Sequence, residues 1–211
     1  MSDTHHGPLL SRYEIIRLLE ELGADLSAHG MKAQLFIVGG AAMTLAFNTR
    51  RLTRDVDGVF EPKSVVHAAA RRIAARHEGL PDDWLNDAVK GLLPGPDPEA
   101  RVIIDQPGVS VSVPSARYLL ALKVQAARID RDDDDIRFLA RQCRASSADE
   151  VLSIAENVLG SKRLLPKSQF IVQQIFPPTS HTSPWQRIVR WWGGRRSSAP
   201  SGHERSDRGR R

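Results

Sequence analysis

Apolar positions in the first fifty residues follow a helical period and then a strand period. Six aliphatic residues recur at the three- and four-residue spacing of a helix that buries one face: Ile15, Ile16, Leu18, Leu19, Leu22 and Leu26. Ser11 and Glu14 form an S-x-x-E capping box, which predicts that this helix begins there and stops near Gly30. The run QLFIV at 34–38 predicts a short buried strand that ends at Gly39-Gly40, followed directly by a helix over 41–47.

The next segments predict a loop and a second strand. Residues 50–54 are polar and are expected to form the loop. Residues 55–60 alternate, with Val56 and Phe60 opposite in phase to Asp55 and Asp57, as in a strand with one buried face.

Helices and one hairpin are predicted for the chain from residue 62 to about 176. Pro62 suits the first position of a helix that runs to about Glu78, and a shorter helix containing Trp84 is expected over 81–93. A β-hairpin is expected over 101–113, around a turn at 106–108. The remaining pattern is helical, with helices expected at about 115–130, 133–144, 147–159 and 167–176.

These elements predict an α/β fold class, a small mixed sheet with flanking helices followed by a C-terminal helical part. We expect residues 1–113 to form the α/β core and 114–176 the helical part. After Pro177-Pro178 the composition shifts to Ser, Pro, Gly, Arg and His, so 177–211 is expected to be a disordered basic tail, with WQRIVRWW at 185–192 as its one candidate element.

Composition favours a cytoplasmic protein without membrane insertion. Hydrophobic residues make up 41% of the chain and charged residues 26%, as in ordinary globular proteins. Cys143 is the single cysteine, so no internal disulfide is possible. No apolar run approaches the roughly 20 residues that a membrane-spanning helix needs, and the N-terminus has no secretory pattern.

The basic charge belongs to the tail. The net charge of the whole chain is +5, whereas 177–211 carries eight arginines against Glu204 and Asp207, a net charge of +6. The remaining residues hold 22 Lys and Arg against 23 Asp and Glu, so their charge gives no sign of nucleic-acid binding. The tail either attracts RNA by charge or has no function.

Two motifs in this order carry candidate chemistry. A Gly pair between a strand and a helix lets backbone N–H groups approach a phosphate, and a helix N-terminus favours negative charge. Asp55 and Asp57, two apart on a strand, leave the same face and can share Mg²⁺. Each motif alone is also common in structural turns and on solvated strand faces. Their order, with 14 residues between Gly40 and Asp55, favours a site for a nucleoside triphosphate.

Basic residues near these motifs suit the same ligand. Arg50, Arg51 and Arg54 lie beside the predicted carboxylates, where guanidinium groups can contact phosphate, although the segment could also be an ordinary basic loop. Lys123 lies on the otherwise apolar stretch YLLALKVQAA and either extends to solvent or contacts phosphate.

At these residues the chain resembles the nucleotidyltransferase superfamily, whose motif hG[GS] is followed, after a helix, by Dh[DE]h. Here the motifs read VGG at 38–40 and DVDGV at 55–59. The closer likeness is to bacterial AbiEii/MenT-like toxin nucleotidyltransferases and a related uncharacterised family, through GLPDDWLN at 79–86 and LLALKVQAARIDRDDDDIRFL at 119–139. The likeness spans roughly residues 10–145, and it implies a minimal nucleotidyltransferase fold.

The resemblance implies a role for each matching residue. Asp55 and Asp57 would be catalytic metal ligands for Mg²⁺, and Lys123 would be catalytic. Nucleotide binding would fall to Gly39, Gly40, Thr53 and Arg54. A last catalytic acid follows the lysine; Asp135 fits its register best and Asp132 second, while Asp130, Asp133 and Asp134 fit a helix cap. Asp105, the one candidate for a third strand carboxylate, fits a structural role better.

The function implied is transfer of a nucleotide from an NTP to an acceptor hydroxyl. The resemblance points to the 3′ end of tRNA as acceptor and to the toxin of a type IV-like toxin–antitoxin pair, with Thr53 as a site that a cognate antitoxin phosphorylates. Two alternatives stay open. The acceptor could be a protein or a small molecule, or the chain could be a catalytically silent regulatory member.

Overall fold

The computed structural model describes residues 7–47, 52–126, 128, 132–160 and 163–177. The expectations for the tail beyond Pro177, including 185–192, fall outside these ranges. So do those for Arg50, Arg51 and Asp130.

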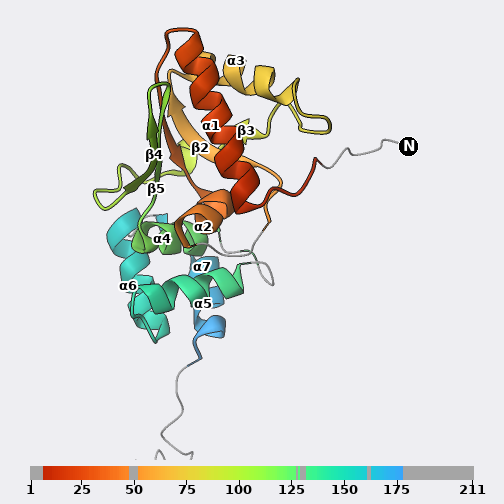
Figure 1. Cartoon of the computed structure of the whole chain (residues 1–211). Helices are drawn as coiled ribbons and strands as arrows, with labels where there is room; N and C mark the ends of the chain where they lie inside the picture. Colours follow the sequence, from red (N-terminus) through yellow and green to blue (C-terminus); the bar gives the residue numbers. More distant parts are fainter. Residues whose placement is uncertain (1–6, 48–51, 127, 129–131, 161–162, 178–211) are drawn as a thin grey trace, which may run out of the picture. The chain divides into compact units, whose positions relative to one another are not determined.

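A mixed sheet of five strands forms the centre of the α/β part (Figure 1). Its strand order is β3-β2-β1-β5-β4. β1 pairs antiparallel with β2 and parallel with β5, while β3 pairs parallel with β2 and β4 pairs antiparallel with β5. The strands are β1 (Ala33–Ile37), β2 (Val56–Glu61), β3 (Leu85–Asn86), β4 (Arg101–Gln106) and β5 (Val109–Val113).

Helices flank the sheet and continue beyond it. The first three are α1 (Arg12–Ala28), α2 (Gly39–Phe47) and α3 (Lys63–Ala74), and a 3-10 turn, η1, spans Lys90–Leu92. The C-terminal helices are α4 (Ala116–Ala126), α5 (Asp133–Gln142), α6 (Ala148–Leu159) and α7 (Pro166–Ile175). The sheet and these helices belong to one compact unit that ends at Pro177. The predicted fold class, a small mixed sheet with flanking helices and a helical part after it, is confirmed.

None of the helices in the described ranges is long and apolar enough to cross a membrane.

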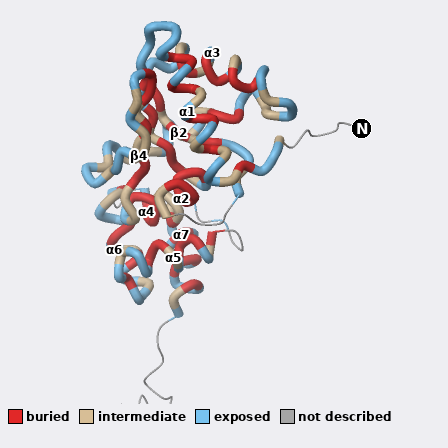
Figure 2. Tube along the Cα trace, in the orientation of Figure 1, coloured by how far each residue is buried: buried red, intermediate tan, exposed pale blue. Residues whose placement is uncertain are grey.

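The two faces of the sheet differ in burial, as the alternating sequence predicts. One face carries fully buried aliphatic side chains such as Ile37 and Val111, which pack with those of α1 and α3 in the core (Figure 2). The opposite face carries the partly exposed Phe36 and Asp57. Helix α4 approaches this second face, where the Tyr118 ring meets the Phe36 ring edge-on at 5.8 Å between centroids. A polar site can therefore form between this face and α4.

The predicted helix over 81–93 is wrong. Turns, the short strand β3 and η1 occupy this stretch instead. Trp84 is fully buried and donates its indole N–H to the Ala70 carbonyl of α3 at 3.1 Å, while Val56 donates to the Trp84 carbonyl at 2.7 Å. Burial of Trp84 and backbone pairing with β2 outweigh the local helix propensity.

Helix ends confirm the predicted caps and correct both boundaries of α3. Both S-x-x-E sequences form reciprocal capping boxes, Ser11 with Glu14 and Ser147 with Glu150. Helix α3 ends at Ala74 rather than near Glu78, and Pro62 is its N-cap rather than its first residue.

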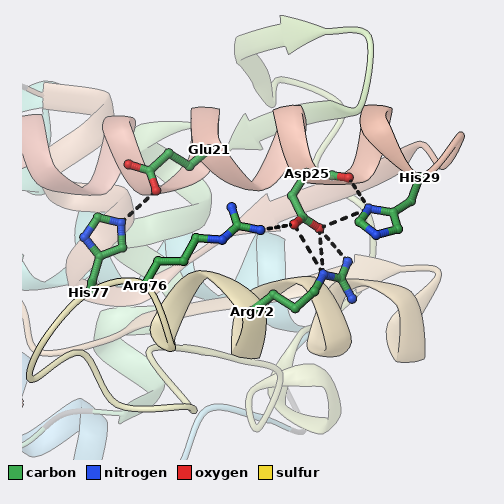
Figure 3. A network of polar contacts seen from close by, with 6 residues as sticks. All are labelled: Glu21, Asp25, His29, Arg72, Arg76 and His77. Atoms are coloured by element: carbon green, nitrogen blue, oxygen red, sulfur yellow. Dashed lines mark hydrogen bonds and ion pairs between the residues drawn. The ribbon is translucent and has the colours of Figure 1, made fainter.

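Charged side chains join α1 to α3 on the surface of the α/β part (Figure 3). The Asp25 side chain is only 1% exposed, and it accepts hydrogen bonds from Arg76 at 2.6 Å and from Arg72 Nε at 3.0 Å. One turn earlier on α1, Glu21 contacts His77 Nε2 at 2.7 Å. These contacts fix α3 against α1, and α3 in turn carries the anchor for Trp84.

Replacing Asp25 with Asn is expected to lower the free energy of unfolding by about 1.5–3 kcal/mol at neutral pH, the range for hydrogen bonds to charged groups. The Arg72 hydrogen bond, with that of Arg76, holds the pKa of the Asp25 carboxyl below its ordinary value of 3.8. A lowered folded-state pKa stabilises the fold above the unfolded-state value, and this contribution is lost as pH falls through the folded-state pKa. Urea denaturation should therefore show the full difference in the free energy of unfolding between parent and variant above pH 3.8, and this difference should become smaller at lower pH.

Glu20→Gln, an exposed change on the same helix, is the matched control. Equal destabilisation by both substitutions would contradict a stabilising role for ionised Asp25. A stability difference between parent and Asp25→Asn that stays the same in acid would contradict it as well.

Candidate active site

The turn after β1 lies directly beside Asp57. Val38 donates its backbone N–H to the Asp57 carbonyl at 2.8 Å, which continues the antiparallel pairing of β1 with β2. Gly39 has φ +66°, a conformation that favours glycine, and a Cβ placed there would lie 3.2 Å from Asp57 Oδ2. The Asp57 carboxylate therefore sits against the backbone at the start of α2.

Thr53 and Asp55 lie beside Gly40, one step further along the same edge. An isolated bridge to Leu10 holds Thr53, with N···O distances of 2.6 and 3.0 Å. The Thr53 hydroxyl donates to the Asp55 carbonyl at 3.1 Å, and a Cβ on Gly40 would lie 3.1 Å from that hydroxyl oxygen. Asp55 is exposed, so its carboxylate can meet a ligand from solvent.

Asn86 is a contact of Asp57 that the sequence reasoning missed. It pairs with Asp57 in the β2–β3 register, and its side chain acts to lower the pKa of the Asp57 carboxyl. The Asn86 amide oxygen accepts from the Ala88 N–H at 3.3 Å, so the amide N–H₂ is the group that can donate to Asp57. Asn86 is the last residue of the stretch GLPDDWLN at 79–86. Because a helix was expected over 81–93, its strand pairing with Asp57 was not predicted.

Burial raises the pKa of the Asp57 carboxyl, and the negative charge of Asp55 raises it further. The Asn86 hydrogen bond and the positive charge of Arg128 act in the opposite direction. A cation shared by Asp55 and Asp57 would relieve the repulsion between them and favour the ionised form of both.

Lys123 lies on α4 and is held by two carboxylates from the start of α5. Its Nζ is 2.9 Å from Asp132 Oδ1 and 2.9 Å from Asp135 Oδ2. The Lys123 side chain is 12% exposed, and both acids are almost wholly buried. The two acids left open for the last catalytic position thus both contact the lysine, and both are buried, although Asp132 is also the N-cap residue of α5.

One cavity of about 490 Å³ joins these elements. Gly39 and Asp57 line it from the sheet side, and Lys123 and Arg128 line it from the helical side. Apolar side chains form much of the remaining wall: Val38, Val89, Leu92, Leu93, Leu119, Leu122 and Leu165. Parts of the chain more than 80 residues apart in sequence therefore meet at one opening that has both charged and apolar side chains in its wall.

Of the described residues considered from the sequence as site residues, only Gly39, Asp57 and Lys123 line this cavity; Gly40, Thr53, Arg54, Asp55, Asp105, Asp132 and Asp135 are not among the lining residues. Arg54 is exposed. Asp105 is exposed on the edge strand β4, which β5 and β1 separate from β2.

The carboxylate pair suits magnesium better than a metal held by protein ligands alone. Within the described ranges no group of three or more His, Cys, Asp or Glu side chains is placed to hold a metal ion. Magnesium commonly binds through one or two carboxylates and completes its shell with water and substrate phosphates. Asp55 and Asp57 meet that requirement. The negative charge of Asp55 raises the pKa of Asp57, and a bound cation would offset this repulsion.

Comparisons of this chain with protein-family models, with curated proteins and with solved structures gave no match.

Substituting Gly39 with Ala is expected to destabilise the fold by roughly 1–2 kcal/mol, the cost of a left-handed conformation for a residue with a Cβ. The new methyl would also press on the Asp57 carboxylate. Gly91→Ala is the control, because its Cβ would meet nothing within 4 Å. Chemical denaturation of both variants measures the difference, and equal stability would show that the turn is not constrained.

Proposed function

We propose that this chain is a Mg²⁺-dependent nucleotidyltransferase that transfers a nucleotide from an NTP to an acceptor hydroxyl. The observation that carries the proposal is the cavity of about 490 Å³ shared by Gly39, Asp57 and Lys123. These residues come from a strand-to-helix turn, a neighbouring strand and a later helix. Their groups are a backbone that can approach phosphate, a carboxylate paired with Asp55, and a cation.

Each part of the site has a separate task in this reaction. The backbone N–H groups at Gly39 and Gly40, at the start of α2, bind phosphate oxygens. Lys123 offsets the negative charge of the triphosphate. Asp55 and Asp57 would hold Mg²⁺, which when bound neutralises charge on the phosphates and orients them. The apolar wall suits the less polar base of the nucleotide.

The chemical step is displacement at the α-phosphorus. The acceptor oxygen forms a bond to this phosphorus as the bond to the bridging α–β oxygen breaks, and pyrophosphate leaves with the electron pair. The hydroxyl proton passes to a base, for which the exposed side of the Asp55–Asp57 pair offers carboxylate oxygens. Asp135, which fits the register of the last catalytic acid best, is buried against Lys123, and this favours a role in orienting that lysine.

The biological role follows from the resemblance of the motifs. It suggests that the acceptor is the 3′ end of tRNA and that the chain acts in the cytoplasm as the toxin of a type IV-like pair. Thr53 supports regulation by a cognate antitoxin, because its hydroxyl lies beside Gly40 and Asp55. A phosphate there would place negative charge where the triphosphate and its metal must bind.

Incubation of the full chain with each labelled NTP, Mg²⁺ and total tRNA tests the proposal. Label is expected on tRNA, and EDTA should abolish transfer. Asp55→Asn and Asp57→Asn should each reduce transfer at least about 100-fold, beyond the 10- to 100-fold typical of residues that only support a metal ligand. Asp83→Asn, an exposed change in the loop before β3, should leave transfer unchanged.

Label on protein or on small molecules alone would move the acceptor to another class and leave the reaction type intact. No transfer from any NTP to any acceptor, or full activity of Asp57→Asn, would overturn the proposal.

A further inference from the structure

Arg128 lines the same cavity as Asp57 and Lys123 and lies within the stretch 119–139 that carries the resemblance, although no role was assigned to it from the sequence. It follows the end of α4 by two residues and lines the opening together with Gly39, Asp57 and Lys123. The hydrogen bond to Asp132 raises the pKa of Arg128, and the negative charge of Asp57 acts in the same direction.

A buried carboxylate fixes the position of Arg128. Asp132 Oδ2 accepts from Arg128 Nε at 3.0 Å and from the Arg128 backbone N–H at 3.1 Å. Asp132 Oδ1 accepts from Lys123 at 2.9 Å and lies 3.4 Å from a second guanidinium nitrogen of Arg128. Asp132 therefore joins the two cations of the cavity through a side chain that is 1% exposed.

The contacts to Asp132 leave part of the guanidinium for a ligand. A guanidinium has five N–H groups, and the contacts to Asp132 use Nε and one terminal nitrogen. The Arg128 side chain remains 51% exposed although Asp132 holds it. A cation that is fixed in orientation and open to a cavity is well suited to phosphate.

A purely structural role is the simpler alternative. Arg128 could serve only to join the residues after α4 to the start of α5 through Asp132. That role explains the bonds to Asp132, but it does not require the guanidinium to line the cavity opposite Gly39 and Asp57. Arg54, the arginine expected from the sequence to bind nucleotide, does not line the cavity.

We propose that Arg128 binds the phosphates of the nucleotide and that Asp132 is a positioning residue for both Arg128 and Lys123. This inference rests on the proposed nucleotidyltransferase function and adds a phosphate contact from the helical side of the cavity. It also gives Asp132 a second partner, Arg128, beside the contact with Lys123 that both acids make. Asp132 already accepts hydrogen bonds from Lys123 and Arg128, which keep its pKa low against the opposing effect of burial. It is therefore poorly suited to take a proton from an acceptor.

Calorimetric titration of the full chain tests the phosphate contact. The probes are each of the four NTPs and inorganic tripolyphosphate, all with Mg²⁺. Arg128→Ala is expected to weaken binding of the preferred NTP and of tripolyphosphate by roughly 10- to 100-fold, because hydrogen bonds to charged groups are lost. Arg128→Lys, which keeps the charge without the planar fork, should recover part of the loss. Arg141→Ala, an exposed change on α5, should bind within about twofold of the parent.

The outcomes separate this inference from the function on which it rests. If the parent binds an NTP and Arg128→Ala binds like Arg141→Ala, the inference fails and the function stands. A loss for NTP without a loss for tripolyphosphate would place Arg128 on the base or sugar and also overturn it. If the parent binds no NTP, both fail. Circular dichroism checks the folding of each variant, and Arg128→Gln replaces Arg128→Ala if that variant does not fold.

A double-mutant cycle tests the positioning role of Asp132. Asp132→Asn should weaken tripolyphosphate binding in the parent and have a smaller effect in the Arg128→Gln background, because the guanidinium that it positions is gone. Effects that add fully would show that Asp132 does not act through Arg128.

Discussion

The pairing of β1 with β2 determines where the proposed site can form. It places the Gly39 turn against Asp57, through the 2.8 Å hydrogen bond between Val38 and the Asp57 carbonyl. Since side chains alternate along a strand, the same register that buries Val56 and Phe60 turns Asp57 to the opposite, partly exposed face. A slip of one residue would bury the carboxylate in the core and remove it from the cavity.

The helical part contributes the positive side of the site. Lys123 alone on a mostly apolar helix could occupy many rotamers, but Asp132 and Asp135 fix its ammonium group at 2.9 Å from each. Both acids come from the start of α5, so the packing of α4 against α5 decides the position of the cation. The site therefore depends on contacts between two regions that the sequence suggested as separate parts.

Much of the fold could be predicted because local patterns determine it. The capping boxes, the strand before Gly39-Gly40 and the hairpin over 101–113 each have a short-range signal, and all are confirmed. The segment 81–93 was assigned wrongly because the burial of Trp84 against α3 is a long-range effect. Asn86 and Arg128 were missed for the same reason, since their roles depend on β3 pairing with β2 and on a contact with Asp132.

The most direct test of the central claim is a crystal structure of the full chain with a non-hydrolysable NTP analogue and Mn²⁺, located by its anomalous scattering. The account predicts Mn²⁺ bound by Asp55 and Asp57, with the phosphates between the Gly39 turn and Lys123. An analogue bound elsewhere, or a metal ion that neither carboxylate contacts, would contradict it.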